Sequence, residues 1–397
     1  MTTLARSISM APILLALAAG PTSGQEAGST GLELGGFPIV KVDSDDGFDF
    51  GLSGAIYEYG DGTLAPYMWT LQPQVEIYTG GRRDITLFID APHLLPEGWR
   101  VNGFLGSERR LYSPYYGIGN EAPYDESLDD AEGPDPHYYE YGSVRRSALF
   151  NLQRRIPGTP LWGLFGAGLV TTRTDPTPDD EGTTLYREQL GPEVETYWSN
   201  YLRAGLVWDT RDRETGPTSG SWSEIVVHWV TRGLGADFDF TRWSVTDRRY
   251  YALTERLVFA HRYFLQGVSG DAPVHQLQRV QSSFLQNEGL GGSRTVRGLP
   301  KNRYAGKGML VWNAELRLRA VEFGAFGRSF YIGLSAFVDQ GRVWAGGPRV
   351  KELFSDLHRG YGGGIQGGMG ENLLVSLDVA HSSEATLPFY IHLGYLF

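Results

Sequence analysis

The sequence predicts an all-β protein that consists of a single transmembrane antiparallel β-barrel with about 16 strands. Short segments in which polar and apolar residues alternate follow one another along most of the chain. A period of two places the two kinds of side chain on opposite faces of a strand. Glycine occurs 53 times and aromatic residues make up 13% of the chain, a composition typical of tight turns and aromatic girdles. No apolar run reaches the roughly 18 residues that a membrane-spanning helix needs.

The first residues have the features of a secretory signal in their usual order. Arg6 gives the positive charge, residues 8–19 form an apolar core too short for a stable membrane anchor, and small residues follow. We therefore interpret residues 1–24 as a cleaved signal peptide, residues 25–33 as a short periplasmic segment and residues 34–397 as the barrel. The expected location is the bacterial outer membrane.

The alternating segments number sixteen, an even number as bacterial barrels require. Short connections alternate with most of the long ones, and this parity puts the long loops outside the cell and both chain termini in the periplasm. Lipid requires a closed barrel, because an open sheet edge cannot be solvated there. The predicted strands cover residues 37–42, 48–59, 67–79, 85–91, 99–110, 138–154, 161–172, 201–208, 221–230, 240–253, 256–268, 309–320, 330–344, 361–369, 373–381 and 389–397.

A glycine-rich, positively charged segment leads into two strands that carry acidic residues. Residues 291–318 begin as a loop and end as a strand. Glu315 of this strand and Asp339 of the next lie on the polar faces, so both can point the same way. Two carboxylates that face an interior of low polarity need a cation, because an unpaired buried charge is costly. Arg297 is the candidate, since its planar guanidinium can bind carboxylates bidentately.

The motifs VRGLPKNRY, NAEL and FVDQGRVW together resemble the BamA/TamA (bacterial surface antigen) family of outer-membrane β-barrels. The resemblance spans most of the chain after the leader. It implies that a long extracellular loop carrying VRG folds into the barrel, where Arg297 locks onto Glu315 and Asp339. Leu299 stands where the family usually has an aromatic residue, which weakens the expected packing of the loop. The other residues of the loop motif are Gly291, Gly292, Val296 and Gly298.

A turn near the middle of the chain also resembles the family, in which a D-x-R-D…P-x-x-G sequence joins two strands. Here the sequence is DTRDRETGPTSG, after the strand predicted at residues 201–208. The motif combines turn-forming residues with an arginine that can bridge carboxylates. Its members are Asp209, Arg211, Asp212, Pro217 and Gly220.

The last predicted strand, residues 389–397, resembles the C-terminal recognition strand of outer-membrane proteins. Its exposed edge offers backbone hydrogen bonds, and alternate apolar side chains set the register of pairing. The resemblance implies contact with the outer-membrane assembly machinery during biogenesis. The residues that share the apolar face are Phe389, Ile391, Leu393, Tyr395 and Phe397.

Composition and motifs argue against several other kinds of protein. The net charge of −11 argues against a nucleic-acid partner, and the absence of cysteine leaves no disulfide or thiolate metal site. The histidines are scattered and no G-x-S-x-G segment exists, so we expect no metal, no cofactor, no catalytic residue and no enzymatic activity. The G-x-G-x-x-G match at residues 362–367 lacks a βαβ context. We interpret it as a strand that the inward loop can approach closely.

Pairs of adjacent arginines are the clearest basic features of the predicted barrel. They could bind lipopolysaccharide phosphates, but we favour the simpler interpretation that they are charges of the lumen or rim. Outer-membrane lipid and lipopolysaccharide are the expected surroundings in either case. Three of these pairs are Arg82–Arg83, Arg109–Arg110 and Arg145–Arg146.

The resemblance favours an assembly or translocation role, in which a seam between the first and last strands opens to guide proteins or lipid into or across the membrane. Family members that assemble or secrete proteins carry periplasmic POTRA domains before the barrel, and we expect none here. Such a role would therefore require a separate periplasmic partner protein. Two alternatives remain open: a passive or gated pore plugged by the loop, and a structural surface-antigen barrel without a transport role.

Overall fold

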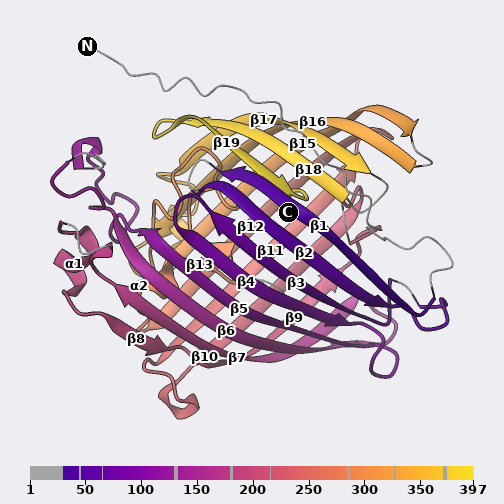
Figure 1. Cartoon of the computed structure of the whole chain (residues 1–397), viewed down its shortest axis with the longest axis horizontal. Coiled ribbons are helices and arrows are strands. Elements are labelled where there is room, and N and C mark those ends of the chain that lie inside the picture. The colour runs from indigo at the N-terminus through magenta and orange to yellow at the C-terminus, as the bar shows by residue number, and fades with distance from the viewer. Residues whose placement is uncertain are drawn as a thin grey trace.

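The computed structural model describes residues 30–43, 46–64, 66–128, 133–178, 182–214, 216–283, 287–325, 328–369 and 373–397. The predicted signal peptide, residues 1–24, lies outside the described residues. The described part of the chain forms a nearly closed antiparallel barrel (Figure 1). Its sheet contains 17 strand segments, and two of these, β8 and β9, pair with the same neighbour, β7, at different places along its length. Counting those two as one gives the predicted 16 barrel strands.

The barrel strands follow one another around the ring in chain order. The first eight are β1 (Leu32–Asp43), β2 (Gly47–Glu58), β3 (Trp69–Tyr78), β4 (Arg82–Ala91), β5 (Trp99–Pro114), β6 (Glu140–Arg155), β7 (Leu161–Asp175) and β9 (Tyr201–Asp209), with β8 (Glu195–Trp198) before β9. The other eight are β10 (Gly220–Val230), β11 (Phe240–Ala252), β12 (Leu257–Gly270), β15 (Gly308–Ala325), β16 (Arg328–Trp344), β17 (His358–Met369), β18 (Leu373–Ser382) and β19 (Thr386–Leu393).

The connections contain short elements of their own. Two short α-helices are α1 (Leu185–Leu190), between β7 and β8, and α2 (Val274–Leu277), between β12 and β15. The second connection, residues 271–307, also contains the small ladder of β13 (Arg279–Val280) and β14 (Asn287–Glu288). We call residues 271–307 the inner loop. No helix in the described part of the chain is long and apolar enough to cross a membrane.

Polar side chains face the inside of the ring and apolar side chains face outward. In β15, Asn313, Glu315 and Arg317 are buried, whereas Leu316 and Leu318 are 42% and 37% exposed. The same alternation recurs around the sheet, where most of the exposed large apolar side chains are leucine, isoleucine, valine or phenylalanine. A polar interior with an apolar exterior is the arrangement of a barrel in lipid.

Each of the 16 predicted segments overlaps a strand of the ring, but the last one was predicted to end too late. β19 ends at Leu393, whereas the prediction extended to Phe397. Gly394 has a φ of +83°, a left-handed conformation that glycine adopts readily and that interrupts a strand. Tyr395 and Phe397 therefore do not continue the face that Phe389 and Ile391 begin.

The residues after Gly394 turn into the barrel and form what we call the C-terminal tail, residues 395–397. Leu396 and Phe397 are buried against Tyr250 and Ala260, on the inner faces of β11 and β12. These strands lie several positions around the ring from β19. The tail therefore crosses the inside of the barrel instead of extending the sheet edge.

The ring closes at a weak seam between its first and last strands, which lie side by side in Figure 1 as the indigo and yellow ends of the sheet. Among the described residues, β1 and β19 share one paired position, Asp43 with Tyr390. Every other neighbouring pair of barrel strands shares at least six described positions, and β15 shares 17 with β16. Backbone pairing is therefore thinnest where the chain's two ends meet.

Candidate functional site

The inner loop turns sharply just before Arg297. Gly291 has a φ of +109°, and a Cβ built on it would lie 1.9 Å from the carbonyl oxygen of Pro300. Only glycine fits such a close backbone approach. The amide of Gly291 donates to the hydroxyl of Thr295 over 2.9 Å, and Gly292 (φ +82°) donates to the carbonyl of Leu299 over 2.9 Å. These contacts place the VRG segment at the tip of a compact turn.

Val296 and Leu299 anchor this turn in the main apolar cluster inside the barrel. Both side chains are buried, and the cluster includes Met309, Val311 and Val343 from the inner faces of β15 and β16. Leu299 thus fills its position fully, although it is smaller than the aromatic residue of the family pattern. We expected weaker packing of the loop at Leu299, but the side chain is fully buried.

Arg297 binds three carboxylates on the inner wall of the barrel. Its Nε lies 2.7 Å from an oxygen of Asp339, its Nη2 lies 3.3 Å from Glu315, and its Nη1 lies 2.8 Å from Asp378. The backbone amide of Arg297 also donates to Asp339 over 3.1 Å. The side chain is 1% exposed. We call Arg297 and these three carboxylates the ion-pair lock.

Asp378 was missed by the sequence prediction, which considered only the two strands that follow the loop. It lies on β18, on the inner face next to buried Ser376 and Ala380. A signal was present in the sequence, because Asp378 is the only charged residue among the alternating residues 373–380. A lone acid on the inner face of a barrel strand requires a cation in the same way as Glu315 and Asp339.

An aromatic ring completes the binding of the guanidinium. The guanidinium carbon of Arg297 lies 3.3 Å from the centre of the Phe337 ring, which adds a cation–π contact to the ion pairs. A Cβ built on Gly362 would lie 2.7 Å from this ring, and one built on Gly364 would lie 2.1 Å from the Asp378 carboxylate. Two of the predicted glycines therefore make room for the wall residues of the ion-pair lock.

The loop backbone itself approaches β17 at Gly360, just outside the glycine stretch at residues 362–367 in which the prediction placed it. A Cβ at Gly360 would lie 1.7 Å from the carbonyl oxygen of Arg297. Gly298, with a φ of +100°, accepts a hydrogen bond from Ser382 over 2.7 Å and donates one to the Tyr390 hydroxyl over 3.2 Å. The VRG segment therefore contacts β17, the end of β18 and the seam strand β19.

The three carboxylates keep Arg297 charged, and neighbouring side chains hold the carboxylates in place. Burial disfavours the charged form of Arg297, but Asp339, Glu315 and Asp378 outweigh it and raise the pKa of Arg297 above its usual value. The guanidinium therefore stays charged at any physiological pH. Asn313 donates to Asp339 over 2.8 Å, so the wall residues are held in place by the strands as well as by the loop.

Glu315 connects the ion-pair lock to the C-terminal tail. Arg317 lies beside Glu315 on the inner face of β15, and its Nε is 3.1 Å from the Glu315 carboxylate. Its Nη2 donates to the backbone oxygen of Phe397 over 3.1 Å, and its guanidinium lies 3.8 Å from the centre of the Tyr395 ring. Contacts thus run without a break from Arg297 through Glu315 and Arg317 to the residues that follow the seam strand.

Further ion pairs bind the inner loop to the wall across the ring from the ion-pair lock. They join loop residues to the inner faces of β4 and β5 and to the turn between β1 and β2. These pairs are Lys301 with Asp46, Glu288 with Arg110 and Arg82, and Arg279 with Glu108. Since β4 and β5 lie about half the ring away from β16, the inner loop spans the lumen from wall to wall.

The predicted turn at residues 209–220 joins β9 and β10. Arg211 donates from Nε and Nη2 to the two oxygens of Asp209, at 2.9 and 2.8 Å. Asp212 accepts from the amide and hydroxyl of Thr218 at 3.0 and 2.6 Å. Gly220 has a φ of +91° and leaves no space for a side chain, and Pro217 is buried. All five residues of the motif therefore contribute to one turn, which is local and separate from the ion-pair lock.

The described residues contain no group of three or more acidic, histidine or cysteine side chains that could hold a metal ion. The ion-pair lock itself has a cation already, and its carboxylates are engaged by Arg297, Asn313 and Arg317. Its geometry is that of a clamp between a loop and a wall.

Comparison with known proteins identifies the type of barrel. A family model described as the Omp85 superfamily domain matches residues 81–394. Among solved structures, BamA from Haemophilus ducreyi lacking POTRA domains 1–3 matches with a TM-score of 0.56 and 14% sequence identity, over 92% of this chain and 70% of that chain. CdiB from Escherichia coli matches with a TM-score of 0.57 and 12% identity, over 92% of this chain and 63% of that one. Comparison with curated protein sequences gives no match.

Proposed function

The chain belongs to the Omp85 superfamily of outer-membrane barrels, and from this premise we propose that it assists the insertion or export of proteins or lipid at the outer membrane. In this proposal the working part is the seam between β1 and β19. The inner loop, held by the ion-pair lock, keeps the lumen filled while the seam opens. The role needs no catalytic residue, and none is proposed.

The observation that carries the proposal is the uneven pairing of the sheet. One described position pairs β1 with β19, whereas every other neighbouring pair of barrel strands shares at least six when β8 and β9 are counted as one strand. In hydrocarbon, each unsatisfied backbone group costs several kcal/mol. A seam with few bonds to break therefore opens at lower cost than any other strand pair, and its exposed groups favour the addition of an incoming strand.

The inner loop and the C-terminal tail favour a link between the lumen and the seam. The hydroxyl of Tyr390, on the seam strand, accepts a hydrogen bond from the backbone amide of Gly298 in the inner loop. The tail after β19 is held by Arg317, which shares Glu315 with Arg297. We propose that a partner or substrate arriving at the tail releases β19 from these contacts.

A separate periplasmic protein is part of the proposal. The described residues form the barrel and its connecting loops, so the proposal assigns the capture of a substrate to a partner. The matched BamA and CdiB chains are longer than this one. Affinity capture of cross-linked periplasmic proteins from intact cells tests this part directly. Recovery of the barrel without any reproducible periplasmic protein contradicts it.

A disulfide across the seam tests the function. The chain has no cysteine, so a pair introduced at Val42 and Ile391, one residue on from the paired Asp43 and Tyr390, provides the only thiols. We expect the oxidised pair to abolish complementation of a deletion strain, measured by its outer-membrane protein and lipid composition. Reduction should restore complementation.

The matched control is a cysteine pair within a stable ladder. Val40 and Phe50 are paired across β1 and β2 and both point outward, so their disulfide constrains the barrel without closing the seam. We expect this control to complement in both redox states. Full complementation by the oxidised seam pair, or equal loss in both pairs, argues against an opening seam.

A loop-plugged pore is the second candidate, and the observation that favours it is the inner loop spanning the lumen through ion pairs on both walls. Release of the loop by Arg297→Ala should then raise single-channel conductance in planar bilayers. Unchanged conductance with a correctly folded variant removes this candidate.

A further inference from the structure

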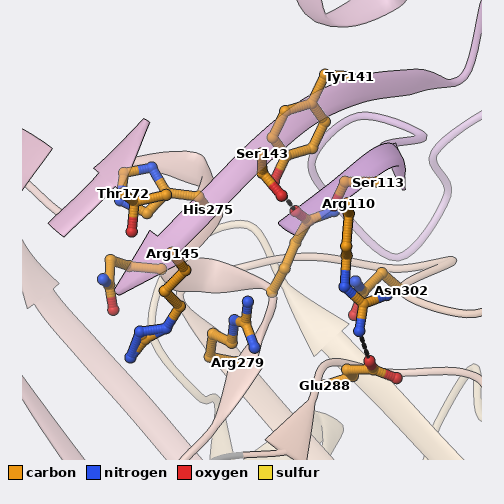
Figure 2. A pocket seen from close by; sticks show the side chains of 12 residues that line it. Arg110, Ser113, Tyr141, Ser143, Arg145, Thr172, His275, Arg279, Glu288 and Asn302 are labelled. Atoms are coloured by element: carbon orange, nitrogen blue, oxygen red, sulfur yellow. Dashed lines mark hydrogen bonds and ion pairs between the residues drawn. The ribbon is translucent and has the colours of Figure 1, made fainter. Parts of the chain in front are cut away.

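A cluster of cationic and hydrogen-bond-donating side chains lies inside the barrel, away from the ion-pair lock. Figure 2 shows Arg110, Arg145 and Arg279 around one cavity beside the inner loop. A second cavity adjoins it, because both are lined by Arg145 and Gln276. We call the second one the arginine cavity. It encloses about 250 Å³ of unoccupied space, part of it open to solvent.

The arginine cavity is formed by strands that lie next to one another in the ring. Arg145 comes from β6, Tyr201 from β9, His228 from β10 and Arg242 from β11, and Gln276 of the inner loop closes it. Each of the four strand residues is buried. The cavity lies in the half of the barrel toward the long loops, which the sequence pattern places on the extracellular side.

Several donors that line the arginine cavity have no hydrogen-bond partner among the described residues. They are the Nε of Arg242, the one protonated ring nitrogen of His228, and the hydroxyls of Tyr201 and Ser199. Arg242 and His228 are each 2% exposed. Buried polar groups are nearly always hydrogen-bonded, so this set of donors points to an acceptor that occupies the cavity.

The charge of the arginine cavity is positive. No acidic residue lines it. The two glutamates on the inner faces of the neighbouring strands are bonded elsewhere: Glu224 accepts from the amide of Ser283 at 3.0 Å, and Glu108 pairs with Arg110 and Arg279 at 2.8 and 3.0 Å. The neighbouring Arg203 also donates all its bonds to other groups, Asn151 and the carbonyls of Ser282 and Ser283.

His275 of the inner loop lies close to the same group of arginines. Burial, and then the guanidinium groups of Arg145, Arg279 and Arg242, lower the pKa of His275 to about 3. The imidazole is therefore neutral at physiological pH. Like charges gathered in a buried space repel one another unless an anion or solvent lies between them.

We propose that the arginine cavity binds a small tetrahedral oxyanion, inorganic phosphate or sulfate, with Arg242 and Arg145 supplying the charge and Tyr201, Ser199 and His228 donating hydrogen bonds. Guanidinium groups bind such oxyanions through charge-assisted hydrogen bonds, and a tetrahedral anion accepts from several directions at once. The ion is free rather than the headgroup of a bilayer lipid, because the cavity opens on the inner face of the sheet and acyl chains lie against the outer face.

Calorimetric titration tests the site. The full chain, folded in detergent and kept in a chloride buffer, is titrated with inorganic phosphate. We expect saturable binding at one site, at least tenfold weaker in Arg242→Gln and several-fold weaker in Tyr201→Phe, which removes only a hydroxyl. Folding of each variant is checked by the heat-dependent change in gel mobility that folded barrels show.

The matched control is Arg262→Gln. Arg262 is also a buried inner-face arginine, but it is bonded to Asn313 and the carbonyl of Arg294 and lies outside the arginine cavity. We expect phosphate binding to be unchanged in this variant. Absence of saturable phosphate binding by the wild type, or equal weakening by Arg262→Gln and Arg242→Gln, overturns the proposal.

A second titration separates the two sources of phosphate. Short-chain phosphatidic acid carries the same phosphate group on a lipid. We expect it to compete weakly or not at all with inorganic phosphate for the site. Saturable binding of this lipid together with failure of free phosphate to bind overturns the assignment to a free ion.

Discussion

The two sides of the barrel differ in how they are held together. On one side, β15 and β16 share 17 paired positions, and the ion-pair lock joins the inner loop to β15, β16 and β18. At the seam, three strands further round the ring from β16, β1 and β19 share one described position. Both sides have polar inner faces, so the difference lies in the length of the ladder and in the charges that cross from the loop.

We infer from this contrast that local unfolding costs most where the loop is clamped to the wall and least where the chain ends meet. Regions that open locally have few backbone bonds and few buried contacts. The inner loop contacts both sides, because Gly298 follows Arg297 in the chain and binds Tyr390 of β19. Changes in the ion-pair lock should therefore affect the seam, and the following variants test that relation in order of expected effect.

Arg297→Ala should have the largest effect. It leaves three buried carboxylates, Glu315, Asp339 and Asp378, without their shared cation. Removing one partner of a buried ion pair destabilises a protein by about 3–5 kcal/mol. We expect a loss of that size in urea unfolding of the barrel in lipid vesicles. The control is Arg294→Ala in the same loop, for which the described residues show no ion pair, and a similar loss in both variants contradicts a specific clamp.

Gly360→Ala should displace the loop backbone. Its Cβ would lie 1.7 Å from the carbonyl of Arg297, whereas a Cβ at Gly367 of the same strand meets nothing within 4 Å. Overpacking of this kind costs about 1–3 kcal/mol. The same unfolding measurement should show this loss for Gly360→Ala and almost none for Gly367→Ala. Equal stability of the two variants would mean that the loop does not approach β17 as described.

Asp378→Asn should have a smaller effect than Asp339→Asn. Asp339 accepts from the side chain and backbone amide of Arg297 and from Asn313, whereas Asp378 accepts one bond from Arg297. A single hydrogen bond to a charged group contributes about 1.5–3 kcal/mol, so we expect Asp378→Asn to lose no more than that. Double-mutant cycles with Arg297→Lys measure each coupling, and a stronger coupling for Asp378 than for Asp339 contradicts the geometry.

Arg317→Gln should release the C-terminal tail, and it should also weaken the pairing of buried Glu315. Without the donor to Phe397 and the contact with Tyr395, the tail should leave the lumen more often. In a Leu396→Cys background, we expect a maleimide to label the single thiol several-fold faster when Arg317 is replaced. Equal labelling rates show that Arg317 does not hold the tail.

Most of the fold could be predicted from the sequence, because alternation with a period of two is a local signal. In β15 and β16, the polar residues Asn313, Glu315 and Asp339 marked the inner face correctly. The end of β19 could not be predicted from alternation, since Phe389 to Phe397 continues the pattern through Gly394. There the backbone conformation of one glycine and the inner-face contacts of Phe397 outweigh the pattern.

The candidate site was partly predictable for the same reason. The charges of Arg297, Glu315 and Asp339 required one another, and the structure brings them together. The roles of Asp378 and Arg317 could not be predicted in this way. They depend on which strands the loop tip and the tail contact, and those contacts form only when the ring is closed. The arginine cavity draws its residues from five strands and the loop, so no single stretch of sequence indicated it.

Hydrogen–deuterium exchange of the folded barrel in lipid, followed by mass spectrometry of peptides, tests the central contrast most directly. We predict that backbone amides of β1 and β19 exchange at least tenfold faster than those of β15 and β16, and that Arg297→Ala speeds exchange in β19 further. Equal protection of the seam strands and of β15 and β16 would contradict the contrast, because the seam would then be as firmly paired as the clamped wall.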